Sequence, residues 1–180
     1  MLVRRWSNRV AIVAILVIVA LGGAWYLWAA VIATSDDPRA YPGSRGDRTL
    51  EQTLRAFQLT LPPCATDVRF LAKRPWPMSD WRHLLIRLVA PDRSCLDSFV
   101  STNSLDATGV VDGKELENDR EREVESVNWH YRSGVAYQTF DSGTSSNEPG
   151  NRYLQACDVQ VEQQGRSFVV YTHCFRWVPQ

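Results

Sequence analysis

Residues 153–177 read YLQACDVQVEQQGRSFVVYTHCFRW, and this pattern predicts two strands joined by a tight turn. Apolar and polar residues alternate on both sides of Gly165-Arg166, as they do in a half-buried β-hairpin. Glycine at the first central position of a two-residue loop is typical of a type II′ turn, so Gln164 should face Ser167. The predicted strands are Tyr153–Val161 and Ser167–Trp177.

The register of this hairpin predicts a disulfide. Counting outward from the turn puts Cys157 opposite Cys174, in the class of facing pairs whose Cα atoms approach to about 4.5 Å, which a disulfide can bridge. Cys64 with Cys95 follows by elimination, because we expect all four cysteines to be exported to an oxidising compartment. The same register predicts a core-facing set: Cys157, Val159, Val161, Phe168, Val170, Thr172 and Cys174.

The opposite face of the hairpin pairs Asp158 with His173. A carboxylate beside an imidazole can do acid-base chemistry, but we favour a plain cross-strand pair on the surface. His83 and His130 share no ligand spacing with each other, so the sequence predicts no metal site. We assign no catalytic, cofactor-binding or metal-ligating residue.

Upstream of the hairpin, patterns alternate between helix and strand. Thr49 and Gln52 form a capping box, and leucines at helical spacing continue until Pro62-Pro63. The other predicted elements are strands Asp67–Lys73, Arg82–Ala90 and Val135–Phe140, and a helix from Pro91-Asp92 to about Thr102. We expect an α+β fold of order α-β-β-α-β-β-β: a mostly antiparallel sheet of about five strands, covered on one face by two helices and stapled by two disulfides.

The acidic stretch Asp106–Glu125 contains both carboxylates and arginines. It does not match the calcium-loop template, and mixed charge is typical of a solvated surface. We therefore interpret it as solvated chain rather than as a metal site.

Val10–Ala33 is an apolar run of 24 residues without a charge, and about 20 such residues span the hydrocarbon core of a bilayer. Aromatic residues flank it, as at membrane interfaces: Trp6 before it, and Trp25, Tyr26 and Trp28 near its far end. Three arginines (Arg4, Arg5, Arg9) precede it. The positive-inside rule therefore places the N-terminus in the cytoplasm and the rest of the chain outside the membrane.

This topology predicts four regions: a basic cytoplasmic tail (1–9), a transmembrane helix (10–33), a polar linker (34–48) and an extracytoplasmic α+β domain (49–180). The alternative is a cleaved signal peptide, because Val31-Ile32-Ala33 resembles a cleavage site. The length of the apolar run favours the anchor. In either case the domain is exported.

Charge excludes one class of partner. From Thr34 onward the chain has 17 basic and 20 acidic residues, without the basic footprint that nucleic-acid binding requires.

The expected partners are the lipid bilayer, through residues 10–33, and an envelope protein or wall component. A candidate contact is the rigid loop that holds Arg74, Trp76 and Met78.

The stretch Leu61-Pro62-Pro63-Cys64-Ala65-x-Asp67-Val68-x-Phe70 is followed by Leu84-x-Ile86-Arg87-Leu88 and by an amphipathic segment ending near Phe99-Val100. Over about forty residues this pattern resembles a group of uncharacterised actinobacterial membrane-anchored envelope proteins. The sequence departs from the group by carrying Cys64. The resemblance implies an extracytoplasmic domain and no particular activity.

Together these features predict a single-pass envelope protein whose outer domain is a non-enzymatic binding or scaffold module, with no cofactor. One alternative is a cell-surface hydrolase of wall polymer, in which Asp158, His173 and carboxylates near Trp129 would converge. Another is a secreted binder or inhibitor, if the N-terminal segment is cleaved.

Overall fold

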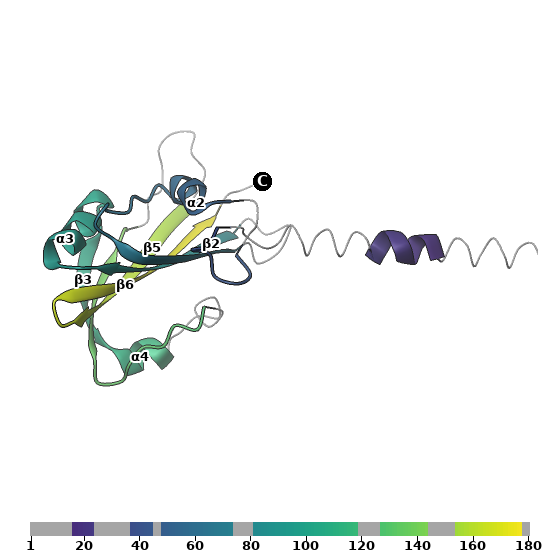
Figure 1. The fold of residues 1–180 in the computed structure, drawn as a ribbon. Helices are drawn as coiled ribbons and strands as arrows, with labels where there is room; N and C mark the ends of the chain where they lie inside the picture. The colour runs from purple at the N-terminus through teal and green to yellow at the C-terminus, as the bar shows by residue number, and fades with distance from the viewer. Residues whose placement is uncertain are drawn as a thin grey trace, which may run out of the picture.

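Six strands form one antiparallel sheet in the order β1-β2-β6-β5-β4-β3 in the computed structural model of the chain (Figure 1). The structure describes residues 16–23, 37–44, 48–73, 81–118, 127–143 and 154–177. The strands are β1 (Thr66–Lys73), β2 (Trp81–Ala90), β3 (Asp106–Asp112), β4 (Ala136–Asp141), β5 (Leu154–Gln164) and β6 (Ser167–Trp177). Within the described ranges, the helices of the domain are α2 (Leu50–Ala56), α3 (Arg93–Thr102) and α4 (Gly113–Asn118).

The predicted C-terminal hairpin is confirmed in its turn, register and disulfide. Gly165 adopts a φ of 66°, a backbone conformation that favours glycine, and Gln164 faces Ser167. Cys157 faces Cys174 with 4.0 Å between their Cα atoms, and the two are bonded. The second predicted disulfide, Cys64–Cys95, is present as well.

Two helices cover one face of the sheet, as predicted. Figure 1 shows α2 and α3 on the same side of the sheet and α4 on the other side. Leu50 of α2 and Phe99 of α3 are buried against a core cluster that also contains the predicted hairpin residues Val159 and Val170. The capping box of Thr49 and Gln52 is formed at the start of α2.

The number of strands was wrong, because the stretch interpreted as solvated chain contains β3 and α4. β3 pairs with β4 at one border of the sheet, and nearly all of its residues are exposed. A strand that buries neither face shows no alternation of apolar and polar residues, so the pattern by which strands are recognised is missing.

The first helix also ends earlier than predicted. It stops at Ala56, and Gln58 has a φ of 52°. The Leu59 N–H then donates to the Leu54 carbonyl at 3.0 Å, which closes the helix in the manner of a left-handed C-terminal cap. Phe57 and Leu59 are both buried. Periodicity alone does not distinguish this turn from a continued helix.

Residues 16–23 form a helix, and the rest of the predicted transmembrane segment lies outside the described residues. In the described part of the chain, no helix has the length and apolar character needed to cross a bilayer. The transmembrane segment therefore stays a prediction.

Candidate functional site

Residues 37–44 belong to the stretch predicted as a linker, and they run along the outer edge of β1. Ala40 forms a parallel bridge with Phe70. The Phe70 N–H donates to the Arg39 carbonyl at 3.0 Å, and the Tyr41 N–H donates to the Phe70 carbonyl at 2.7 Å. The buried Ser44 hydroxyl accepts from the Ala72 N–H at 3.0 Å. The chain is thus fixed to the sheet before α2 begins.

Asp37 joins residues 37–44, which we name the docked segment, to the start of α2. Its carboxylate accepts hydrogen bonds from the Leu50 N–H at 3.0 Å and from the Arg39 guanidinium at 2.9 Å. Arg39 also pairs with Glu51 at 2.8 Å. The Asp37 side chain is only 4% exposed. The hydrogen bond from Arg39, together with backbone N–H donors, holds the pKa of this carboxyl well below its usual range in spite of burial.

Replacing Asp37 with alanine should detach residues 37–44 and lower the free energy of unfolding by about 2 kcal/mol at pH 7, since hydrogen bonds to a charged group are lost. The folded-state pKa is depressed, so this stabilisation is present above the unfolded pKa, about 3.9, and is lost as pH falls below it. The difference in free energy of unfolding between wild type and Asp37→Ala should therefore become smaller below about pH 4.

Denaturant titration of the full chain at several pH values measures this difference, and hydrogen exchange at the Tyr41 amide reports detachment. Asp97→Ala is the matched control, because Asp97 is 58% exposed and pairs with Arg93 on the same helix. A difference that does not change with pH would contradict the role given to Asp37.

A hollow of about 330 Å³ lies beside the docked segment, on the face of the sheet away from α2 and α3. We name it the aromatic hollow. Trp129 (3% exposed) and Tyr171 (8% exposed) meet edge to face with ring centroids 5.2 Å apart, and the Trp129 indole N–H donates to the Tyr41 hydroxyl at 3.2 Å. The remaining lining residues are Asp67, Arg69, Arg87, Val127, Asn128 and His130.

Polar and strained groups concentrate at this hollow. Arg87 of β2 forms an ion pair with Asp67. Asp67 and Asn128 both have positive φ, 45° and 55°, which is uncommon outside glycine and clusters at functional sites. Burial, and then the charge of Glu162, raise the pKa of Tyr171 above its ordinary value.

A second, larger depression adjoins the first. It has a volume of about 750 Å³ and lies between α2, the residues that follow α2, and the start of β1. We name it the apolar groove, since it is lined by Leu54, Leu59, Leu61, Pro62, Pro63, Ala65 and Val68, with Arg39, Arg55 and Glu51 among its polar residues. Asp67 and Arg69 line both depressions. The two therefore meet at the edge of β1.

A buried carboxylate holds the chain segment that carries Trp129. Glu162 of β5 is 2% exposed and forms an ion pair with Arg132. It also accepts from the Tyr137 hydroxyl at 3.3 Å and from the Gln164 amide at 3.1 Å. The burial of Glu162 is not evident from the sequence, because a glutamate on the polar side of an alternating strand indicates solvent exposure. Here the 127–135 segment covers that side.

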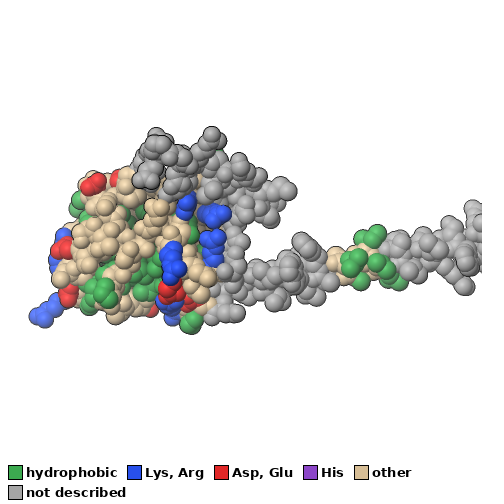
Figure 2. All heavy atoms as spheres, turned by 90° about the horizontal axis from the view of Figure 1, so that it is seen from above, with side chains coloured by type: hydrophobic (Ala, Val, Ile, Leu, Met, Phe, Trp, Pro, Cys, Tyr) green, Lys and Arg blue, Asp and Glu red, His purple; other side chains and the backbone are tan. Residues whose placement is uncertain are grey.

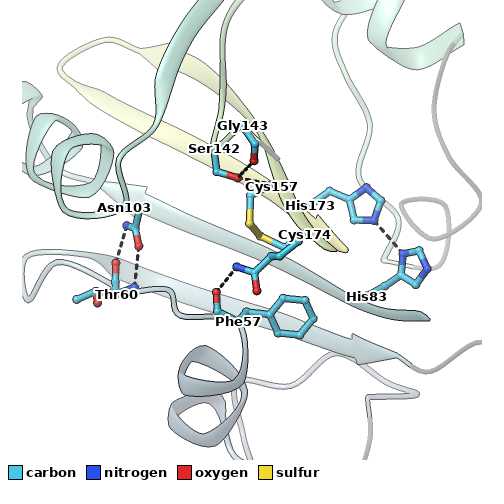
Figure 3. Close-up of a disulfide and its surroundings, with 10 residues drawn as sticks. Phe57, Thr60, His83, Asn103, Ser142, Gly143, Cys157, His173 and Cys174 are labelled. Atoms are coloured by element: carbon cyan, nitrogen blue, oxygen red, sulfur yellow. Dashed lines mark hydrogen bonds between the residues drawn. A yellow bond between two sulfur atoms is a disulfide. The ribbon is translucent and has the colours of Figure 1, made fainter. Parts of the chain in front are cut away.

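His173 lies opposite Asp158, as the hairpin register predicts, but the interpretation as a surface pair was wrong for the histidine. His173 is 6% exposed, and its Nε2 lies 3.2 Å from Nδ1 of His83. Figure 3 shows the two rings pointing toward each other, from β6 and β2. The strand order, which places β2 next to β6, is needed to find this contact.

The predicted site residues divide into two groups. The four disulfide cysteines are paired as expected. Arg74, Trp76 and Met78, the candidate partner contact, lie outside the described residues.

In the described ranges, no three His, Cys, Asp or Glu side chains form a group able to hold a metal ion. Glu117, from the acidic stretch, instead accepts from the Tyr131 N–H at 3.0 Å.

Comparison with protein-family models, with curated proteins and with solved structures finds no match to this chain. The geometry described above is therefore the basis for the function proposed next.

Proposed function

We propose that the protein is a membrane-tethered extracytoplasmic module that binds an envelope component at the edge of β1. The observation that carries this proposal is the meeting of the aromatic hollow and the apolar groove at Asp67 and Arg69. Pockets that combine apolar walls with a few convergent polar groups are the usual form of a binding site.

The docked segment supports the same proposal. Tyr41 lines the aromatic hollow and Arg39 lines the apolar groove, so the chain that enters the domain from the predicted membrane segment forms part of both walls. A partner bound there would be held next to the tether. Two disulfides support an exported location, because they persist in oxidising compartments.

The proposed topology predicts that the full chain sediments with membranes and resists carbonate extraction. Protease added to cells stripped of their wall should digest the domain, since the domain lies outside the membrane. Sequencing the mature N-terminus separates the tether from a secreted form: Met1 supports the anchor, and Thr34 supports cleavage. Protection of the domain from protease would overturn the orientation.

The binding site is tested by filling the aromatic hollow. His130 lies on its rim and is exposed, so His130→Trp should reduce recovery of a cross-linked envelope partner from detergent-solubilised membranes at least severalfold. Gln163→Trp is the control, because Gln163 is exposed beside the turn of the C-terminal hairpin. Equal recovery of the same partner with both variants would place the contact elsewhere.

The hydrolase alternative has its own test. Asp158→Ala should leave any wall-related phenotype unchanged, because Asp158 is exposed and the histidine opposite it is engaged with His83. Loss of phenotype with a retained fold would favour the hydrolase instead.

A further inference from the structure

Two arginines face each other where the aromatic hollow and the apolar groove meet. Arg69 of β1 lies directly opposite Arg87 of β2, and both line the hollow. Like charges that face each other on neighbouring strands repel. Within the described residues, Asp67 is the one carboxylate paired with them: it forms an ion pair with Arg87, and its Oδ1 lies 3.9 Å from Nε of Arg69. One negative charge thus stands against two positive charges at the hollow.

Both guanidinium groups are accessible from the hollow. The side chains of Arg69 and Arg87 are 48% and 26% exposed. Arg69 donates to the Pro38 carbonyl at 3.0 Å, while Arg87 donates to Asp67 and interacts with Tyr171. A guanidinium has five N–H donors, so these contacts leave donors on each arginine that can bind a further oxyanion.

A phosphate ester suits these donors better than a carboxylate does. Arginine binds phosphate through paired N–H groups, and a phosphate monoester has three oxygens that can accept from both guanidinium groups. A carboxylate has two oxygens and would only duplicate Asp67. The Tyr41 hydroxyl also lines the hollow. It accepts from the Trp129 indole at 3.2 Å, so its own O–H can donate to the same phosphate.

The adjoining apolar groove has a wall that is held in place before any ligand binds. The Thr60 N–H donates to Oδ1 of Asn103 at 2.8 Å, and the Asn103 amide donates to the Thr60 carbonyl at 2.9 Å (Figure 3). The disulfide from Cys64 to Cys95 fixes the end of this wall. Four apolar side chains that line the groove are partly exposed: Leu54, Leu61, Ala65 and Val68. They offer an apolar chain a preformed surface.

The charge around the two depressions favours an anion. Together they are lined by four arginines (Arg39, Arg55, Arg69 and Arg87) and two carboxylates (Glu51 and Asp67). Figure 2, which looks down on the side that carries α2 and α3, shows Lys and Arg side chains gathered toward the right, the side on which α2 lies in Figure 1. A surplus of one sign of charge around a depression attracts a ligand of the opposite charge.

We propose that the two depressions together bind a lipid phosphate of the envelope, with its phosphate between Arg69 and Arg87 and its apolar chain in the groove. Arg69 lines both depressions, so the head site and the tail site share a wall. The ligand must bend around the edge of β1, which a flexible alkyl chain can do. This inference rests on the proposed function, whose ligand it names.

The test is calorimetric titration of the full chain in phosphatidylcholine nanodiscs, with empty nanodiscs as the baseline. The probes are hexyl phosphate, ethyl phosphate and hexyltrimethylammonium. Hexyl phosphate should bind with saturation. Its affinity should exceed that of ethyl phosphate by about twofold to fourfold for each added methylene that the groove covers. Hexyltrimethylammonium, which has the same chain and the opposite charge, should not bind.

Four substitutions separate the head site from the tail site. Arg87→Gln should weaken hexyl phosphate about tenfold or more, since hydrogen bonds between charged groups are lost. Asp67→Asn should strengthen it severalfold, because asparagine tolerates the positive φ of Asp67 and the competing charge is removed. Leu61→Ser should weaken hexyl phosphate but leave ethyl phosphate unchanged. Arg166→Gln, in the exposed turn of the C-terminal hairpin, is the control and should change nothing.

Tighter binding by Asp67→Asn supports the proposal in a way that misfolding cannot imitate. Unchanged or weaker binding by that variant overturns the head site, and so does equal binding of hexyltrimethylammonium. Equal affinity for ethyl and hexyl phosphate overturns the tail site. If hexyl phosphate does not bind while His130→Trp still lowers recovery of the partner, only the lipid phosphate is refuted. If His130→Trp has no effect either, the proposed binding site is refuted as well.

Discussion

Removing the Cys157–Cys174 disulfide by paired alanine substitution is expected to lower the free energy of unfolding by about 3 kcal/mol, and removing Cys64–Cys95 by slightly more. The chain-entropy model gives this order, because the sequence separations are 17 and 31 residues. Domains of this size have about 5 to 15 kcal/mol of net stability. Loss of both bridges should therefore leave a marginal fold.

Urea denaturation of the detergent-solubilised chain, followed by tryptophan fluorescence, measures both effects. The two paired variants serve as controls for each other, since each keeps one bridge. Thermal unfolding of the same samples should show a fall in melting temperature of roughly 10 °C for each pair. Peptide mapping without reduction checks the pairing itself, and a peptide that links Cys64 to Cys157 or to Cys174 would refute the hairpin register.

Gly113→Ala is expected to lower the free energy of unfolding by about 3 kcal/mol, at the upper end of what overpacking usually costs. A Cβ at this position would lie 2.2 Å from the Arg132 carbonyl oxygen and 2.8 Å from the Tyr137 ring. Real Cβ atoms do not approach a backbone oxygen so closely, so the backbone must move. The Gly113 N–H donates to the Val135 carbonyl at 2.9 Å, and this contact would move with it.

Gly134→Ala is the control for this substitution. A Cβ at Gly134 meets no atom within 4 Å, but its φ is 76°, so alanine costs only the left-handed strain of about 1 kcal/mol. Denaturant titration should therefore separate the two variants. Because the 127–135 segment carries Trp129 to the aromatic hollow, Gly113→Ala should also alter Trp129 fluorescence. Equal stability of the two variants would show that the backbone at the start of α4 can shift without a cost in stability, and would contradict the prediction.

The parts of the fold that were predictable are those in which local pattern and tertiary contacts agree. In the C-terminal hairpin, the alternation, the turn residue and the two cysteines indicate one register, and that register is present. β3 was missed because its contacts are made by backbone hydrogen bonds with β4, while its side chains stay exposed. The sequence of β3 therefore contains almost no pattern that indicates its pairing with β4.

The candidate site was harder to predict, because it depends on which distant segments meet. Asp37 lies in a polar stretch rich in proline and glycine, and nothing local indicates that its carboxylate accepts the Leu50 N–H. Trp129 and Tyr171 meet only when the 127–135 segment folds over the sheet. Contacts of this kind follow from strand order, which neither periodicity nor composition specifies.

The two disulfides join the first cysteine to the second and the third to the fourth, so their loops do not overlap in sequence. In the proposed topology the N-terminus stays in the cytoplasm, and the chain that follows the transmembrane segment is translocated in order of its sequence. Cys64 and Cys95 then emerge while Cys157 and Cys174 are still to come, and no other thiol competes with them. Cys174 emerges only near the end of transit. The order of translocation thus favours the native pairing among the three that four cysteines allow, without reshuffling by an isomerase.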